Sequence, residues 1–307
     1  MNRTFTQLLL LAGAVLLLVL WCASGWMAAK PVPDRAFLSG ALAIAVILVN
    51  AVLLHLANDR ILAGSGLLTP AVYIVLAVAN PGSLWFSSFH TASLLMAASL
   101  VFFLSFCAIR PGMGALLGAW LTLGTAGLLL PQLYWLVPLY VLLAVSKADD
   151  KLKFMAASLL AICLPAGVAL AFASMGGGHT TSAFFTGIWE QMSRLPHRPL
   201  HYSAAKLCRL ALTALAALLA AVRALSRIGH YKIARSAAVF RIILLTLSFG
   251  ALTVLFFPDG QAAPLMALPL ALLLNEYFGT TDPGKGATTL AIILLLVLAA
   301  ERVTYFV

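Results

Sequence analysis

Eleven apolar segments follow one another along the chain, each bounded by charged residues, proline or glycine. An α-helix needs about 20 mostly apolar residues to cross a bilayer, where hydrocarbon offers no hydrogen-bond partner to an exposed backbone. The pattern therefore predicts an all-α, polytopic integral membrane helix bundle, with residues 1–307 forming a single transmembrane domain. The segments cover residues 6–27, 36–57, 61–79, 91–109, 113–130, 133–146, 152–174, 203–222, 237–257, 261–278 and 286–306.

The composition excludes a soluble globule of this size. Only 9% of the 307 residues are charged and 63% are hydrophobic, whereas a soluble domain carries about 25% charged residues. A net charge of +10 is typical of membrane proteins whose cytoplasmic loops face anionic lipid. Membrane lipids are therefore the expected partners and nucleic acid is not, while protein partners are left open.

The sixth segment leaves the number of spans between ten and twelve. Segment 133–146 is too short to cross upright, so it either pairs with the fifth segment, broken at Pro131 and Pro138, or crosses only halfway. Segment 6–27 is expected to be a retained first span, because its apolar run exceeds the length of a signal-peptide core. Eleven spans is the count that we carry forward.

The distribution of basic residues predicts the orientation. With eleven crossings and a cytoplasmic amino terminus, 12 of the 19 lysines and arginines fall on the inner side. The loop 223–236 carries four of them and no acid, so the positive-inside rule assigns it to the cytoplasm. The expected location is a bacterial inner (cytoplasmic) membrane, with the carboxyl terminus outside.

The interval 175–202 is the longest polar stretch, and this orientation makes it an outer-face loop. Within it, apolar side chains fall on one helical face and Glu190, Gln191 and Arg194 on the other, which predicts an amphipathic helix in the membrane interface. The apolar members are Phe184, Phe185, Ile188, Trp189, Met192 and Leu195.

Polar groups collect on the outer face, where we place the candidate site. Several guanidinium and ammonium groups can bind a phosphate by charge-assisted hydrogen bonds, and a carboxylate or imidazole beside them can take a proton from a hydroxyl. The candidate catalytic residues are Asp34 and His201. The candidate substrate-binding residues are Arg194, His197, Arg198, Lys206 and Arg209.

Simpler interpretations of the same residues stay open. The basic side chains are also suited to gripping lipid phosphates without any catalysis, and Asp34 is placed to pair with Arg35 or Lys30. The spacing of His197 and His201 suits a metal on a helix, but the prolines around them argue against a regular helix. No metal and no cofactor are therefore expected, and the four scattered cysteines predict neither a metal site nor a disulfide framework.

The stretches 114–145 and 146–165 resemble the middle of GT-C type membrane glycosyltransferases, which use polyprenyl-phosphate sugars. In that family a G-x-x-x-G-x-x-x-G span leads to a proline-broken element, a basic cytoplasmic turn and the next span. Residues 80–106 resemble the segment before it. The layout is also similar to uncharacterised polytopic inner-membrane proteins of Bacteroidota.

The family resemblance implies a catalytic base in the first outer loop, where Asp34 is the acid available. This chain departs from the family by having Arg35 where a second acid is usual, and His90 where an acid can open the fourth span.

Three function classes follow from the sequence. The first is a GT-C-like protein handling polyprenyl-phosphate-linked sugars at the outer face, and whether it is an enzyme depends on Asp34. The second is a non-catalytic membrane component of an envelope-assembly or secretion complex. The third is a transporter or lipid flippase. The absence of charged residues from the middle of every predicted span argues against proton coupling.

Overall fold

The computed structural model describes residues 3–28, 34–62, 67–78, 85–108, 112–146, 150–175, 181–193, 204–257, 261–279 and 285–303. Within these ranges the chain forms twelve α-helices joined by turns and short η helices, and no strand. The all-α class predicted from the sequence is confirmed. The α-helices are α1 (Arg3–Ala28), α2 (Asp34–Ala57), α3 (Leu68–Val78), α4 (Ser88–Ala108), α5 (Met113–Leu129), α6 (Val137–Val145), α7 (Lys151–Met175), α8 (Thr181–Ser193), α9 (Ala204–Ser226), α10 (Ile233–Phe256), α11 (Ala263–Phe278) and α12 (Lys285–Val303).

Each of the eleven predicted apolar segments overlaps helix within the described residues. Five helical segments are long and apolar enough to cross a membrane, and six further apolar helices are shorter. The five are Leu38–Leu62, Ser88–Cys107, Lys151–Ser174, Leu207–Ser226 and Arg235–Phe256. By length and composition the chain is a multi-pass helical membrane protein.

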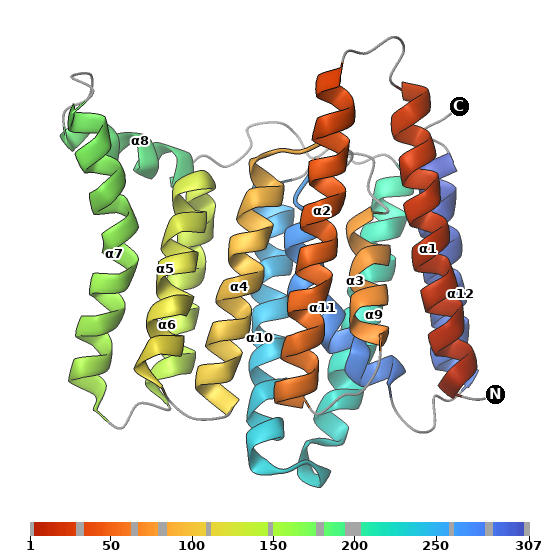
Figure 1. The fold of residues 1–307 in the computed structure, drawn as a ribbon. Coiled ribbons are helices and arrows are strands. Elements are labelled where there is room, and N and C mark those ends of the chain that lie inside the picture. The colour runs from red at the N-terminus through yellow and green to blue at the C-terminus, as the bar shows by residue number, and fades with distance from the viewer. Residues whose placement is uncertain are drawn as a thin grey trace.

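Most helices stand side by side with their axes close to a common direction (Figure 1). α8 is the exception, because it lies across one end of the bundle, which we call the α8 end. The opposite end, which we call the η4 end, holds the turn between α9 and α10 with η4 (Ile228–His230). Helix α1 begins at the η4 end, and α12 finishes at the α8 end.

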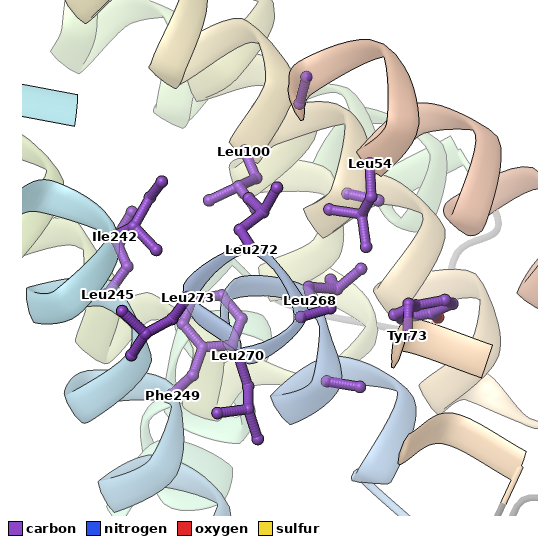
Figure 2. Close-up of a cluster of buried hydrophobic side chains, with 14 of the residues drawn as sticks. Leu54, Tyr73, Leu100, Ile242, Leu245, Phe249, Leu268, Leu270, Leu272 and Leu273 are labelled. Carbon is purple, nitrogen blue, oxygen red and sulfur yellow. The ribbon is translucent and has the colours of Figure 1, made fainter. Parts of the chain in front are cut away.

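Helix α11 lies at the centre of the bundle. Fourteen of its sixteen residues are buried. Figure 2 shows its leucines, among them Leu268 and Leu273, surrounded by side chains from α2, α3, α4 and α10. Because α11 meets other helices on all sides, it has an apolar surface all round rather than one apolar stripe.

Helix α7 occupies the edge of the bundle and, unlike α11, leaves large apolar side chains exposed. Leu152 and Phe172 are 80% and 71% exposed, which suits a helix that faces lipid. Its close approach to α5 occurs at Gly124, where an added Cβ would lie 2.9 Å from the carbonyl oxygen of Ile162. Small residues permit such backbone contacts between membrane helices.

The predicted proline-broken element is a short η helix followed by a short α-helix. Pro131 begins η3 (Pro131–Leu136), and Pro138 lies in the first turn of α6. Proline is tolerated in a first turn because its missing N–H has no partner there in any case. The break places η3 against α8 and sends α6 back toward the η4 end.

Candidate functional site

The structure describes only part of the predicted outer-face site. Four candidate residues lie outside the described ranges: Arg194, His197, Arg198 and His201. Asp34 is the first residue of α2, and Lys206 lies in the first turn of α9. Arg209, one turn further along α9, is half-buried. All three helical positions are at the α8 end (Figure 1).

Helix α8 is fixed across its end of the bundle by η3. The Gln132 amide Nε2 donates to the backbone oxygen of Gln191 at 2.9 Å, and the Trp135 indole Nε1 donates to that of Met192 at 3.2 Å. Both acceptors belong to the last turn of α8, where carbonyl groups have no partner within the helix. The broken element after α5 therefore holds α8 in place.

The side chains of α8 divide into two sets. Phe184, Ile188 and Met192 recur every fourth residue and are half-buried. Phe185 and Trp189 are 52% and 61% exposed. The helix thus turns one apolar row toward the protein and presents aromatic side chains outside it.

The η4 end contains a buried ion pair that the sequence analysis did not identify. Glu276 of α11 accepts two hydrogen bonds from Arg235 of α10, each 3.0 Å long. Tyr231 donates a third, 3.1 Å long, to the same carboxylate. The Glu276 side chain is 3% exposed and that of Arg235 33%. With three donors, this carboxylate is well compensated for its burial.

Aromatic rings complete this cluster. The Arg235 guanidinium lies 4.5 Å from the centre of the Tyr231 ring, and that of Arg223 lies 5.3 Å from the Tyr277 ring. Burial raises the pKa of the Tyr231 phenol, and the neighbouring Glu276 carboxylate raises it further. Tyr231 is therefore a neutral donor to Glu276 at physiological pH, and the cluster ties the start of α10 to the end of α11.

A second polar group lies in the interior, among α2, α3 and α4. The Asn50 amide donates to the Tyr73 hydroxyl at 2.9 Å and to the Ser93 hydroxyl at 3.0 Å. Ser93 in turn donates to the backbone oxygen of His90. Each of these residues is at most 1% exposed. Nearer the η4 end, Asn275 of α11 donates to Asn58 at 2.8 Å.

These interior groups link helices and do not form a metal centre. No set of three histidine, cysteine, aspartate or glutamate side chains in the described ranges could hold a metal ion. The sequence did contain a usable signal for them. Asn50 lies in α2 and Asn58 directly follows its end, both within an apolar segment, and Glu276 interrupts an otherwise apolar run.

Comparison with known proteins gives no further assignment. No family model, curated protein or solved structure matches this chain.

Proposed function

We propose that the chain crosses the membrane eleven times with its amino terminus in the cytoplasm. The support is the uneven placement of its bases. Of the fourteen lysines and arginines in the described ranges, ten lie at the η4 end and four at the α8 end. The ten are Arg3, Arg60, Lys151, Lys153, Arg223, Arg227, Lys232, Arg235, Arg241 and Lys285; the four are Arg35, Lys206, Arg209 and Arg302. The positive-inside rule assigns the richer end to the cytoplasm.

At the opposite, extracytoplasmic end, the protein binds the phosphate of a polyprenyl-phosphate-linked sugar. One observation carries this proposal: α8 is fixed across the end of the bundle at which α2 begins with Asp34, and the first two turns of α9, with Lys206 and Arg209, lie at the same end. A helix with exposed aromatic residues in the headgroup layer is suited to position a lipid. Bases at the same level are suited to its phosphate.

The chemistry that fits these residues is glycosyl transfer, as the GT-C resemblance implies. Asp34 or His201 would take the proton of an acceptor hydroxyl as its oxygen attacks the anomeric carbon of the sugar. The bond from that carbon to the phosphate oxygen breaks as the new glycosidic bond forms. The released polyprenyl phosphate keeps the bonding electrons and is stabilised by the basic residues, among them Lys206 and Arg209.

A second candidate is a non-catalytic membrane component of an envelope-assembly or secretion complex. The observation that favours it is the use of buried polar groups as ties between helices. Asn50 joins α2 to α3 and α4, Asn275 joins α11 to α2's end, and Glu276 joins α11 to α10. Such ties suit a rigid scaffold.

Binding and turnover of a polyprenyl-phosphate sugar by the purified chain distinguish these functions. Arg209→Gln should weaken binding about tenfold, because a charge-assisted hydrogen bond is lost. Arg227→Gln, at the η4 end, is the matched control and should bind normally. Asp34→Asn should bind normally but lose turnover in an enzyme.

Three other results would each change the assignment. Equal binding by the wild type and Arg209→Gln would contradict the lipid-phosphate site. No binding by any variant would favour the scaffold. Movement of the lipid across proteoliposomes without sugar transfer would identify a flippase.

A further inference from the structure

We infer that Arg241, on the cytoplasmic half of α10, is the centre of a second phosphate-binding site, which takes the headgroup of an anionic lipid. This site lies at the η4 end, so it is separate from the proposed sugar-lipid site at the α8 end. Binding does not depend on the proposed function. Only its assignment to the cytoplasmic leaflet rests on the proposed orientation.

Arg241 is a charged side chain placed inside an apolar bundle. It lies about two turns into α10 and within the candidate span Arg235–Phe256. The residue is 6% exposed. A guanidinium stays ionised in proteins. Arg241 therefore places a positive charge in the apolar interior of the bundle, where it needs a compensating anion.

The described residues supply Arg241 with little compensation. Its Nη2 reaches the Ser146 hydroxyl at the long distance of 3.4 Å, and its buried Nη1 has no hydrogen-bond partner. The Ser146 hydroxyl donates its own hydrogen to Leu143. The carboxyl end of α6 contributes only the partial negative charge of a helix terminus.

None of the acids described at this end, Asp59, Asp150 and Glu276, forms an ion pair with Arg241. Asp150 pairs with Lys153 at 3.3 Å and caps the start of α7. Glu276 is fully used by Arg235 and Tyr231. Among the described residues, the buried guanidinium therefore has no negatively charged partner.

The position of Ser146 indicates where that charge comes from. Ser146 is exposed and caps the end of α6, so the Arg241 guanidinium reaches from the interior to a point at the protein surface. Apolar side chains are exposed on the same two helices: Leu142, one turn before Ser146 on α6, is 69% exposed, and Phe240, next to Arg241 on α10, is 48% exposed. A phosphate at Ser146 can accept from the guanidinium while its acyl chains lie against these residues.

Native mass spectrometry of the full chain in a nonionic detergent tests this site. The probe is phosphatidylglycerol, compared with phosphatidylcholine of the same acyl chains. We expect Arg241→Gln to weaken retention of phosphatidylglycerol about tenfold and to leave phosphatidylcholine unchanged. The matched control is Arg60→Gln, which removes an exposed base at the same end and should bind like the wild type.

Thermal unfolding separates a binding site from a merely structural arginine. Without lipid, Arg241→Gln should melt at or above the wild-type Tm, because an uncompensated buried charge is removed. Phosphatidylglycerol should raise the Tm of the wild type and of Arg60→Gln but not that of Arg241→Gln. Protection by inorganic phosphate alone, with no preference among lipids, would assign the site to a soluble anion and overturn the lipid headgroup.

Two results would overturn the site altogether. One is equal retention of phosphatidylglycerol by the wild type and Arg241→Gln. The other involves Asp149, which lies outside the described residues. If Asp149→Asn lowered the Tm and phosphatidylglycerol protected neither variant nor wild type, the counterion would be that carboxylate rather than a lipid.

Discussion

Helices α11 and α7 are both apolar, yet they have opposite surroundings. α11 is 16 residues long and has fourteen of them buried, whereas α7 is 25 residues long and leaves residues such as Leu152 and Phe172 largely exposed. In water such exposure would be costly, but in lipid it costs nothing. Hydrophobicity therefore identifies both helices as membrane segments and does not show which of them is central.

The difference between the two regions lies in their polar contacts and their close approaches. The centre, around α11, contains the Glu276–Arg235 pair and the Asn50 and Asn275 hydrogen bonds. The edge is formed by α7 and α8. α7 contacts the rest of the bundle at Gly124 of α5, and α8 accepts two hydrogen bonds from η3. We therefore expect substitutions in the centre to act on the whole bundle and those at the edge to act locally.

The largest effect is expected from breaking the ion pair. Arg235→Gln leaves the Glu276 carboxylate 3% exposed without its cation, and we expect it to lower the free energy of unfolding by about 3 kcal/mol. Adding Glu276→Gln should restore most of the loss, because no buried charge then remains. Unfolding by SDS titration measures both. If Arg235→Gln alone were as stable as the wild type, the ion pair would not stabilise the centre of the bundle.

The next effect concerns the contact between α5 and α7. Gly124→Val places atoms against the carbonyl oxygen of Ile162, so the two helices must separate, at a cost of about 2 kcal/mol. Gly167→Val on α7 is the control, since nothing lies within 4 Å of its added Cβ. The same SDS titration applies. Equal stability of the two variants would place the edge contact elsewhere.

A smaller effect is expected in the interior polar group. Asn50→Leu removes the donor to Tyr73 and Ser93, and hydrogen bonds between membrane helices contribute about 1 kcal/mol each or less. We expect a loss of about 1 kcal/mol, measured as above. Asn50→Gln keeps an amide but should still be less stable than the wild type, because the longer side chain does not fit a fully buried position. A gain in stability for Asn50→Leu would contradict the proposed tie.

The smallest effect is local to α8. Trp135→Phe removes one exposed hydrogen bond to Met192, which stabilises the docked helix by about 0.5 kcal/mol. Hydrogen exchange should become faster in α8 while the unfolding of the bundle is unchanged. Trp85→Phe at the same end serves as the control. Global destabilisation by Trp135→Phe would mean that the edge is coupled to the centre after all.

The sequence predicted the helices well because apolar runs bounded by charge, proline and glycine are local signals. Segment 152–174 lies within one residue of α7 at either end, and the proline-broken element falls at Pro131 as expected. What the sequence could not predict is which helix is surrounded by others. The burial of α11 and the pairing of Glu276 with Arg235, 41 residues away, depend on long-range packing.

The candidate site was predictable only as a set of residue types. Asp34, Lys206 and Arg209 were chosen for their chemistry and their expected side of the membrane, and the fold does bring the starts of α2 and α9 to one end. Spacing along a chain does not determine distances between separate helices. The buried Arg241 was missed because it stands near a span end, where an arginine usually extends to the headgroup layer.

Cysteine labelling from outside intact cells tests the central claim most directly, which is that the η4 end faces the cytoplasm. In a background with all native cysteines changed to alanine, Gly187→Cys on α8 and Gly229→Cys in η4 form a matched pair, because both positions have open space around an added Cβ. A membrane-impermeant maleimide should modify Gly187→Cys in intact cells and Gly229→Cys only after permeabilisation. Labelling of Gly229→Cys alone in intact cells would show that the protein is inserted the other way round.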